Sequence, residues 1–282
     1  MEIIHDPVKM QERVTTLRQE AKRIGFVPTM GYLHEGHLSL FQGGRRENDI
    51  LAVSIFVNPT QFDRPEDLRT YPADLDGDLA KSKAEGVDLV FVPEQKTIYP
   101  HGYATFVDVE GLTHRWEGAH RPGHFRGVAT IVAKLFHVVK PHRTYFGQKD
   151  YQQAQIVRRM VCDLDMDIEV VVLPTIREPD GLALSSRNVN LTLEERRQAP
   201  TLYRALCWAA DQIASGEQDA RLLVEGMQQM IRKGTSATID YVSLCHPESL
   251  EPLEEVEGSA VALLAVRFSK ARLIDNIVIG LH

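Results

Sequence analysis

The sequence predicts an α/β protein, with a doubly wound parallel sheet in its N-terminal part and a smaller α+β domain after it. Up to residue 173, short apolar runs typical of buried strands alternate with segments of helical periodicity. Pro174 and the group Pro179, Asp180 and Gly181 then interrupt this alternation. We therefore expect two domains, residues 1–175 and residues 176–282.

Composition and charge favour a globular protein that acts on small molecules. The chain has 282 residues, 43% of them hydrophobic, and a net charge of −7. Basic residues cluster only in pairs such as Arg45 and Arg46, so we expect no nucleic-acid partner. No run is long and apolar enough to suggest a signal peptide or a membrane span, and the three cysteines form no Cys-x-x-Cys pair. We expect a cytoplasmic protein with reduced thiols and no membrane partner.

Individual elements follow from two patterns. Strands are expected where a short apolar run ends at a turn, and helices where apolar residues recur every three or four positions. The expected strands are residues 24–27, 49–57, 87–92, 143–147, 168–173, 239–245 and 259–268. The expected helices are residues 11–21, a helix following residues 34–37, then 75–85, 125–136, 194–214 and 220–233.

Residues 28–38 join the first of these strands to a helix and contain a His-x-Gly-His motif. The start of a helix has unpaired N–H groups and a partial positive charge, so it binds anions. His34 and His37 are three positions apart and are expected on one helix face. Gly36 has no Cβ, which would let a flat ring lie against the backbone. The motif therefore indicates a site for an anion, with room for a flat ring beside it.

Two other interpretations of the motif stay open. Both histidines could simply be exposed at a helix start. A zinc site is less well matched, because the zincin motif places its histidines four positions apart. The other histidines, including His114, His120 and His142, are scattered without the spacing of metal ligands.

Polar residues also follow the later strands, where the ligand crevice of a parallel sheet is expected. Gln61 could hydrogen-bond a hydroxyl or carboxylate, or could be only a turn residue beside Pro59. Lys149 could neutralise phosphate charge, and Asp150 could accept from ribose hydroxyls. Asp78 is a candidate magnesium ligand, although acids at a helix start more often interact with the helix dipole.

Beyond the expected boundary, Ser185, Ser186 and Arg187 offer two hydroxyls and a guanidinium, a set suited to a triphosphate. Ser185 or Ser186 could instead cap the next helix. Thr192 with Glu195 fits a capping box better, which would leave the serines free. With no binding motif of its own beyond this loop, the second domain is expected to act as a lid over the first.

Six blocks of sequence resemble the pantothenate synthetase family, which belongs to the HxGH nucleotidyltransferase-like superfamily. They are PTMGYLHEGH (28–37), FVNPTQF (56–62), HRPGHF (120–125), FGQKDYQQ (146–153), DGLALSSRN (180–188) and RLIDN (272–276). The resemblance implies a Rossmann-like first domain and an active site in the crevice between the domains. It also implies an ATP-dependent ligase that condenses (R)-pantoate with β-alanine through a pantoyl-adenylate, releasing AMP and pyrophosphate.

The resemblance further implies roles for residues of this chain. The catalytic set would be His34, His37, Lys149, Ser185, Ser186 and Arg187. ATP would be bound by the same residues with Met30, Gly147 and Asp150, and pantoate by Asn58, Gln61, Arg121 and Gln153. Mg²⁺ would accompany ATP, and the protein would form a homodimer. Gln148 stands where the family usually has Glu, so no acid can act at that position.

Two functions of other classes stay open at this point. A nucleotidyltransferase that adenylylates a phosphate would share the histidine motif, but it would need cations rather than Gln61 and Gln153 around its acceptor. A nucleotide-binding module without catalysis would keep the first domain and would not need Ser185.

Overall fold

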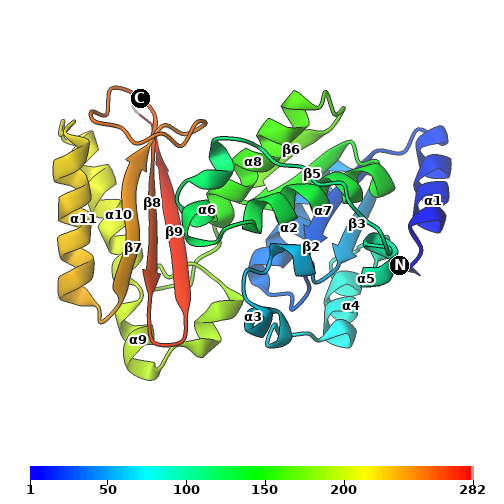
Figure 1. Ribbon diagram of the computed structural model, residues 1–282, viewed down its shortest axis with the longest axis horizontal. Coiled ribbons are helices and arrows are strands. Elements are labelled where there is room, and N and C mark those ends of the chain that lie inside the picture. Colours follow the sequence, from blue (N-terminus) through cyan, green and yellow to red (C-terminus); the bar gives the residue numbers. More distant parts are fainter. Residues whose placement is uncertain (281–282) are drawn as a thin grey trace. The chain divides into compact units, whose positions relative to one another are not determined.

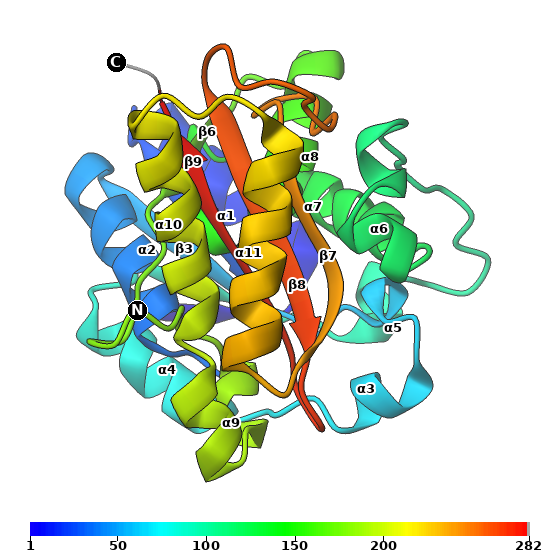
Figure 2. The ribbon, with the colours of Figure 1, turned by 90° about the vertical axis from the view of Figure 1, so that its left-hand side faces the viewer.

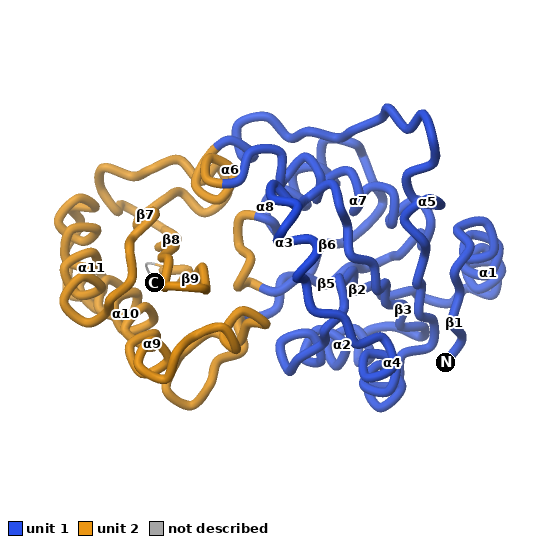
Figure 3. Tube along the Cα trace, turned by 60° about the horizontal axis from the view of Figure 1, so that its bottom comes forward, with its two compact units in different colours: residues 1–114, 121–147, 153–174 blue, residues 115–120, 148–152, 175–282 orange. Residues whose placement is uncertain are grey.

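The computed structural model describes residues 1–280. The chain divides into two compact units, coloured separately in Figure 3. The first unit comprises residues 1–114, 121–147 and 153–174, and the second comprises residues 115–120, 148–152 and 175–282. Two short segments that precede residue 175, residues 115–120 and 148–152, thus belong to the second unit.

The first unit is built on a parallel sheet of six strands, which confirms the predicted fold class. In sheet order, the strands are β1 (Glu2–Ile4), β4 (Leu89–Phe91), β3 (Ile50–Ile55), β2 (Ile24–Thr29), β5 (Arg143–Gly147) and β6 (Glu169–Leu173). β2 and β3 are buried along almost their whole length. Burial on both faces explains why they read as continuous apolar runs in the sequence.

Helices connect these strands and cover the sheet (Figure 1). They are α1 (Pro7–Gln19), α2 (Glu35–Glu47), α3 (Pro65–Arg69), α4 (Leu75–Ala84), α5 (Gln95–Ile98), α7 (His124–Val139) and α8 (Tyr151–Asp163), with the short 3₁₀ turns η1 (Pro59–Gln61) and η2 (Leu112–His114). The 3₁₀ turn η3 (Gln148–Asp150), between β5 and α8, belongs to the second unit. Val27, Phe41, Leu51 and Tyr145 belong to one core cluster, which joins α2 to the sheet.

The strand order reverses between β2 and β5. From β2 the chain proceeds through β3 to β4 on one side, and then crosses to β5 and β6 on the other. Gly25 pairs with Arg143 and Phe26 with Thr144, and continuing this register puts Thr29 level with Gly147. In open parallel sheets, ligands bind where the loops diverge at such a reversal. The loop after β2 begins there.

The second unit has an antiparallel sheet in the order β7 (Thr238–Cys245), β8 (Ala260–Arg267) and β9 (Arg272–Ile279). Two long helices, α10 (Thr201–Ala214) and α11 (Ala220–Gly234), lie side by side on one face of this sheet (Figure 2). Leu206, Met227 and Leu264 are part of the apolar core between the helices and the sheet. The shorter elements are α6 (Glu117–His120), η4 (Ser186–Asn190) and α9 (Leu193–Gln198).

The sequence prediction was wrong in several places. The helix expected at residues 194–214 is two helices, α9 and α10, because the chain turns at Ala199 and Pro200. The prediction omitted α8, the strands β1 and β9, and the short helices α3 and α5. Within residues 1–280, no helix is both long enough and apolar enough to cross a membrane.

Candidate active site

The loop after β2 takes an unusual path that Asp78 supports. Gly31 has a φ of +84° and Tyr32 a φ of +52°, so two successive residues are left-handed. Asp78, which is 1% exposed, accepts from the main-chain N–H groups of Tyr32 and Leu33 at 2.7 Å each. Both carboxylate oxygens therefore accept hydrogen bonds from the loop. The magnesium-ligand role considered for Asp78 stays a prediction.

His34 and His37 do not share a helix face as predicted, because His34 is the N-cap residue of α2. His34 has an extended backbone with φ −135°, and its Nδ1 accepts from the N–H of Gly36 at 3.1 Å. His37 Nδ1 accepts from the N–H of His34 at 3.3 Å. The two ring centroids lie 4.2 Å apart. Since each Nδ1 accepts, each neutral ring carries its proton on Nε2 and has a donor there.

The His34 ring lies close over Gly36. A Cβ at position 36 would lie 2.9 Å from His34 Cε1, which is closer than real contacts allow. The His-x-Gly-His motif therefore describes a capping arrangement. Its histidine at the N-cap folds back over the helix start, and glycine at position 36 leaves room for that ring in its present position.

Asn58 serves as a support for Gln61. It is 1% exposed; its Nδ2 donates to Gln61 Oε1 at 3.0 Å and to the carbonyl of Gly127 at 3.1 Å. Its Oδ1 accepts from the Tyr99 hydroxyl at 2.8 Å. Burial raises the pKa of Tyr99 to about 12, so the hydroxyl keeps its proton and remains a donor. Because Asn58 holds Gln61 Oε1, the outer group of Gln61 is its Nε2 donor.

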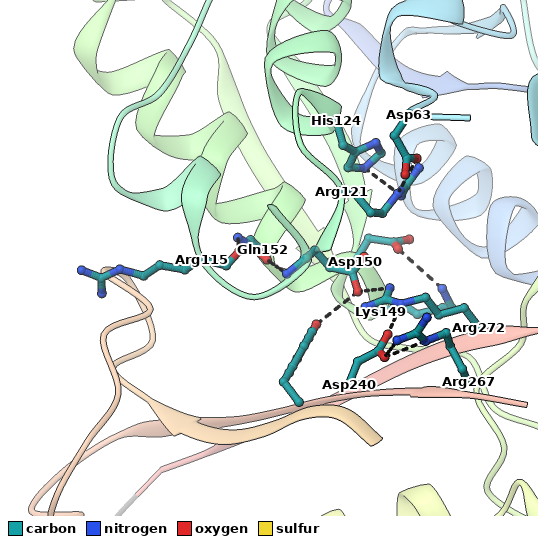
Figure 4. A network of polar contacts seen from close by, with 12 residues as sticks. Asp63, Arg115, Arg121, His124, Lys149, Asp150, Gln152, Asp240, Arg267 and Arg272 are labelled. Atoms are coloured by element: carbon teal, nitrogen blue, oxygen red, sulfur yellow. Dashed lines mark hydrogen bonds and ion pairs between the residues drawn. The ribbon is translucent and has the colours of Figure 1, made fainter. Parts of the chain in front are cut away.

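Arg121 lies beside Gln61 in a small polar cluster. It contacts His124 Nε2 at 3.1 Å, the Gln61 carbonyl at 3.4 Å and Asp63 at 3.6 Å. His124 Nδ1 donates to the same Gln61 carbonyl at 2.8 Å. Figure 4 shows Asp63 and His124 turned toward Arg121. The hydrogen bond from His124 fixes the turn that carries Gln61. The spacing of the histidines in the sequence did not predict this role.

The second unit contains a pocket with a cationic lining. Its volume is about 300 Å³, including space open to solvent. The lining residues include Lys149, Ser185, Arg187, Asn188, Arg272 and Asp275. Arg272 is ion-paired with Asp240 and Glu117, and Asp275 with Arg177. Lys149 and Arg187 are therefore the cations of this lining that suit an anion. Lys149 is largely covered, with 19% of its side chain exposed, and its ammonium lies 3.5 Å from Asp150.

The loop at residues 185–190 is a capped turn. Ser185 Oγ accepts from the N–H of Arg187 at 3.2 Å, so this serine is a cap and is not left free as expected. The predicted capping box of Thr192 and Glu195 is confirmed. Main-chain hydrogen bonds from Thr192 and Ser269 lower the pKa of Glu195 to about 2. A capping hydroxyl retains its own hydrogen, so Ser185 can still donate.

The predicted site residues are distributed over both units. Those in the first unit are Met30, His34, His37, Asn58, Gln61, Asp78, Arg121, Gly147 and Gln153, and those in the second are Lys149, Asp150, Ser185, Ser186 and Arg187. Met30, Gln153 and Ser186 are half-buried, and Arg187 is exposed. Lys149, Ser185 and Arg187 share one pocket.

The RLIDN block supplies supporting residues for which the sequence analysis predicted no role. Asn276 donates to the carbonyls of Gln148 and Lys149 at 2.9 Å each. Gln148 Nε2 in turn donates to Asn276 Oδ1 at 3.4 Å. At the position where the family usually has Glu, this chain thus has an amide that faces another amide.

Arg272, from the same block, belongs to a buried charge network. It donates to Glu117. It also donates to Asp240, as does Arg267 (Figure 4). Burial opposes ionisation of Asp240, but the hydrogen bonds from Arg272 and Arg267 outweigh it and lower the pKa of this carboxyl. The network links α6 to the sheet of the second unit, so it stabilises one side of the pocket.

Comparison with known proteins gives one consistent result. The sequence model of the family described as pantoate-beta-alanine ligase matches residues 2–278. Pantothenate synthetase from Moorella thermoacetica is 50% identical over the whole length of both chains, and that from Chloroflexus aurantiacus is 54% identical over 90% of each.

Solved structures agree with the sequence relatives. Pantothenate synthetase from Thermus thermophilus superposes with a TM-score of 0.92 at 48% identity, covering 98% of this chain and 99% of that one. Pantoate-beta-alanine ligase from Francisella tularensis, solved with beta-gamma ATP and beta-alanine, superposes with a TM-score of 0.80 at 35% identity and covers 99% of this chain and 97% of that one. The chain described here belongs to the pantoate-beta-alanine ligase family.

Proposed function

We propose that this protein condenses (R)-pantoate with β-alanine at the expense of ATP, forming pantothenate, AMP and pyrophosphate. The observation that carries the proposal is the capped His34–His37 pair at the start of α2, where the strand order reverses. An N-terminal helix end with two imidazole donors suits the phosphates of a nucleotide. Membership in the ligase family supports the choice of acid and amine.

The reaction proceeds in two steps. A carboxylate oxygen of pantoate attacks the α-phosphorus of ATP, and pyrophosphate leaves. The amine of β-alanine then attacks the acyl carbon of the pantoyl-adenylate, and AMP leaves with that carboxylate oxygen. Neither step requires an enzyme nucleophile, so the protein acts by positioning and by stabilising charge.

Residues of both units have roles in the first step. His34 and His37 donate from Nε2 to the phosphates, and Lys149, Ser185, Ser186 and Arg187 stabilise the charge that grows on the leaving pyrophosphate. Met30, Gly147 and Asp150 contribute to binding the nucleoside. The second unit acts as a lid whose closure excludes water.

Pantoate is bound through neutral donors. Gln61 offers Nε2 because Asn58 occupies its Oε1, and Gln153 provides a second amide. Arg121 contributes mainly by holding the turn that carries Gln61, because its guanidinium already contacts Asp63 and the Gln61 carbonyl. Asn58 likewise acts through Gln61.

Three further properties belong to the proposal. Mg²⁺ would accompany ATP and be held chiefly by the phosphates and water. The family resemblance favours a homodimer, which light scattering would test. The three cysteines are unpaired in the structure, which suits a cytoplasmic location.

Oxygen labelling tests the chemistry. Pantoate labelled with heavy oxygen in its carboxylate should give labelled AMP and unlabelled pyrophosphate. Labelled pyrophosphate should exchange into ATP when pantoate is present without β-alanine. Label in inorganic phosphate would show an acyl phosphate instead. Exchange without any acid, or no exchange at all, would contradict the proposed function.

A further inference from the structure

Asn276 fixes the main chain at Lys149. Each of the two hydrogens of its Nδ2 group has an acceptor, the carbonyls of Gln148 and Lys149, both at 2.9 Å. Its Oδ1 accepts from Gln148 Nε2 at 3.4 Å. The amide therefore uses its whole donor capacity on two successive peptide groups. One side chain thus holds both carbonyls of this turn.

Asn276 is itself rigidly placed. It is 2% exposed, and its N–H donates to Asp275 Oδ1 at 2.8 Å. Asp275, with 4% of its side chain exposed, forms a two-point ion pair with Arg177 at 2.7 and 2.9 Å. Arg177 also donates to the Asn276 carbonyl at 3.3 Å and stacks on Tyr203. A buried ion pair thus sets the position of the amide that holds residues 148–149.

The position of this backbone matters because of the Lys149 side chain. A lysine ammonium is a point charge on a flexible stem, but only 19% of the Lys149 side chain is exposed. Because the stem is packed, the position of the ammonium follows the position of the Cα. Lys149 lines the cationic pocket with Ser185 and Arg187, and Asp275 lines it as well. A displacement of about 1 Å at a catalytic group can cost about 10²-fold in rate.

We infer that Asn276 is a positioning residue, whose contribution to the reaction passes through Lys149. The inference rests on the proposed function, because it assigns Lys149 to the phosphates of ATP. Asn276 itself touches no substrate in this scheme. Its effect should therefore appear in kcat of the first half-reaction more than in the ATP KM, and it should disappear when Lys149 has no ammonium.

A double-mutant cycle tests this route. Asn276→Ala, Lys149→Ala and the double variant are compared with the parent by pantoate-dependent exchange of labelled pyrophosphate into ATP. We expect Lys149→Ala to cost about 10²-fold or more, and Asn276→Ala to cost about 10-fold to 10²-fold. In the Lys149→Ala background, removing Asn276 should cost no more than about twofold, since a residue acting through Lys149 has nothing left to position.

Two further variants separate positioning from folding. Asn276→Asp keeps the shape but turns oxygens toward both carbonyls, so it should match Asn276→Ala in activity. Thr235→Ala is the matched control, because Thr235 also bonds to the main chain of the second unit, accepting from Ala237 N–H at 3.2 Å and donating to the Ile231 carbonyl at 2.8 Å. This control should lose comparable stability and keep the parental exchange rate.

The outcomes are distinguishable. An equal penalty for Asn276→Ala with and without Lys149, or an Asn276 variant that fails to fold in circular dichroism, would make Asn276 a structural residue and overturn the inference. Full exchange in Lys149→Ala would instead remove the proposed role of Lys149. Absence of exchange in the parent protein would contradict the proposed function itself.

Discussion

Replacing Asp78 by asparagine should damage both stability and catalysis, although Asp78 touches no substrate in our proposal. Its carboxylate accepts from two successive N–H groups, those of Tyr32 and Leu33, at 2.7 Å each. Asparagine has the same shape but keeps only one acceptor. Its NH₂ group would face one of the two N–H groups, and the loop before His34 would lose one support.

The magnitude follows from the burial of the contact. Asp78 is 1% exposed, so water cannot replace the lost partner. A hydrogen bond to a charged group contributes about 1.5–3 kcal/mol, and a buried donor left unpaired costs about 1–3 kcal/mol. We expect the free energy of unfolding to fall by about 3 kcal/mol. Because Tyr32 holds a strained φ of +52°, the loop should relax and the exchange rate should fall by about 10²-fold.

Urea denaturation and pantoate-dependent pyrophosphate exchange measure the two effects. Asp74→Ala is the matched control on the same helix, where Asp74 caps α4 by accepting from Gly77 N–H at 3.0 Å. It should cost about 1 kcal/mol and leave the exchange rate at the parental value. An Asp78→Asn protein within about 0.5 kcal/mol of the parent, with parental exchange, would refute the reasoning.

Three further changes should have defined results. Gly31→Ala should destabilise the protein and slow exchange, because φ is +84° and a Cβ would lie 2.7 Å from Asp78 Oδ2; parental activity would contradict this. Tyr99→Phe should raise the pantoate KM more than the ATP KM by releasing Asn58, and equal effects would count against it. The pKa of Glu195 lies at about 2, below its usual 4.5, so its ionised form stabilises the fold above pH 4.5, and this contribution is lost as pH falls toward 2. In Glu195→Gln, the free energy of unfolding should therefore depend less on pH in that window. The same pH dependence as in the parent would exclude the capping role.

The parallel sheet could be predicted because its signal is local. A strand such as β3 is buried on both faces, so it appears as an apolar run whatever its neighbours are. The reversal of strand order then brings polar residues at strand ends toward one edge. The His-x-Gly-His motif was equally visible. The geometry of the motif could not be predicted. His34 is three positions before His37 whether it is the N-cap residue or lies in the first helical turn.

The supports of the site could not be predicted, because their partners are distant in the sequence. β9 carries Asp275 and Asn276 in the middle of a buried strand, where polar residues argue against a strand. Each is satisfied by a residue about 100 or more positions away, Arg177 for Asp275 and Gln148 for Asn276. No local pattern shows that such a charge or amide has a partner.

Asp78 and Asn276 use the same arrangement with opposite hydrogen-bond polarity. Asp78 accepts from two successive N–H groups in the loop after β2, and Asn276 donates to two successive carbonyls in the turn after β5. An ionised carboxylate can only accept, whereas one NH₂ group can donate twice. The side chain at each position is thus the one that its peptide groups require. The exchanges Asp78→Asn and Asn276→Asp keep shape and reverse polarity, so a loss of activity in both would show that the hydrogen bonds, rather than the volumes, hold these two turns in place.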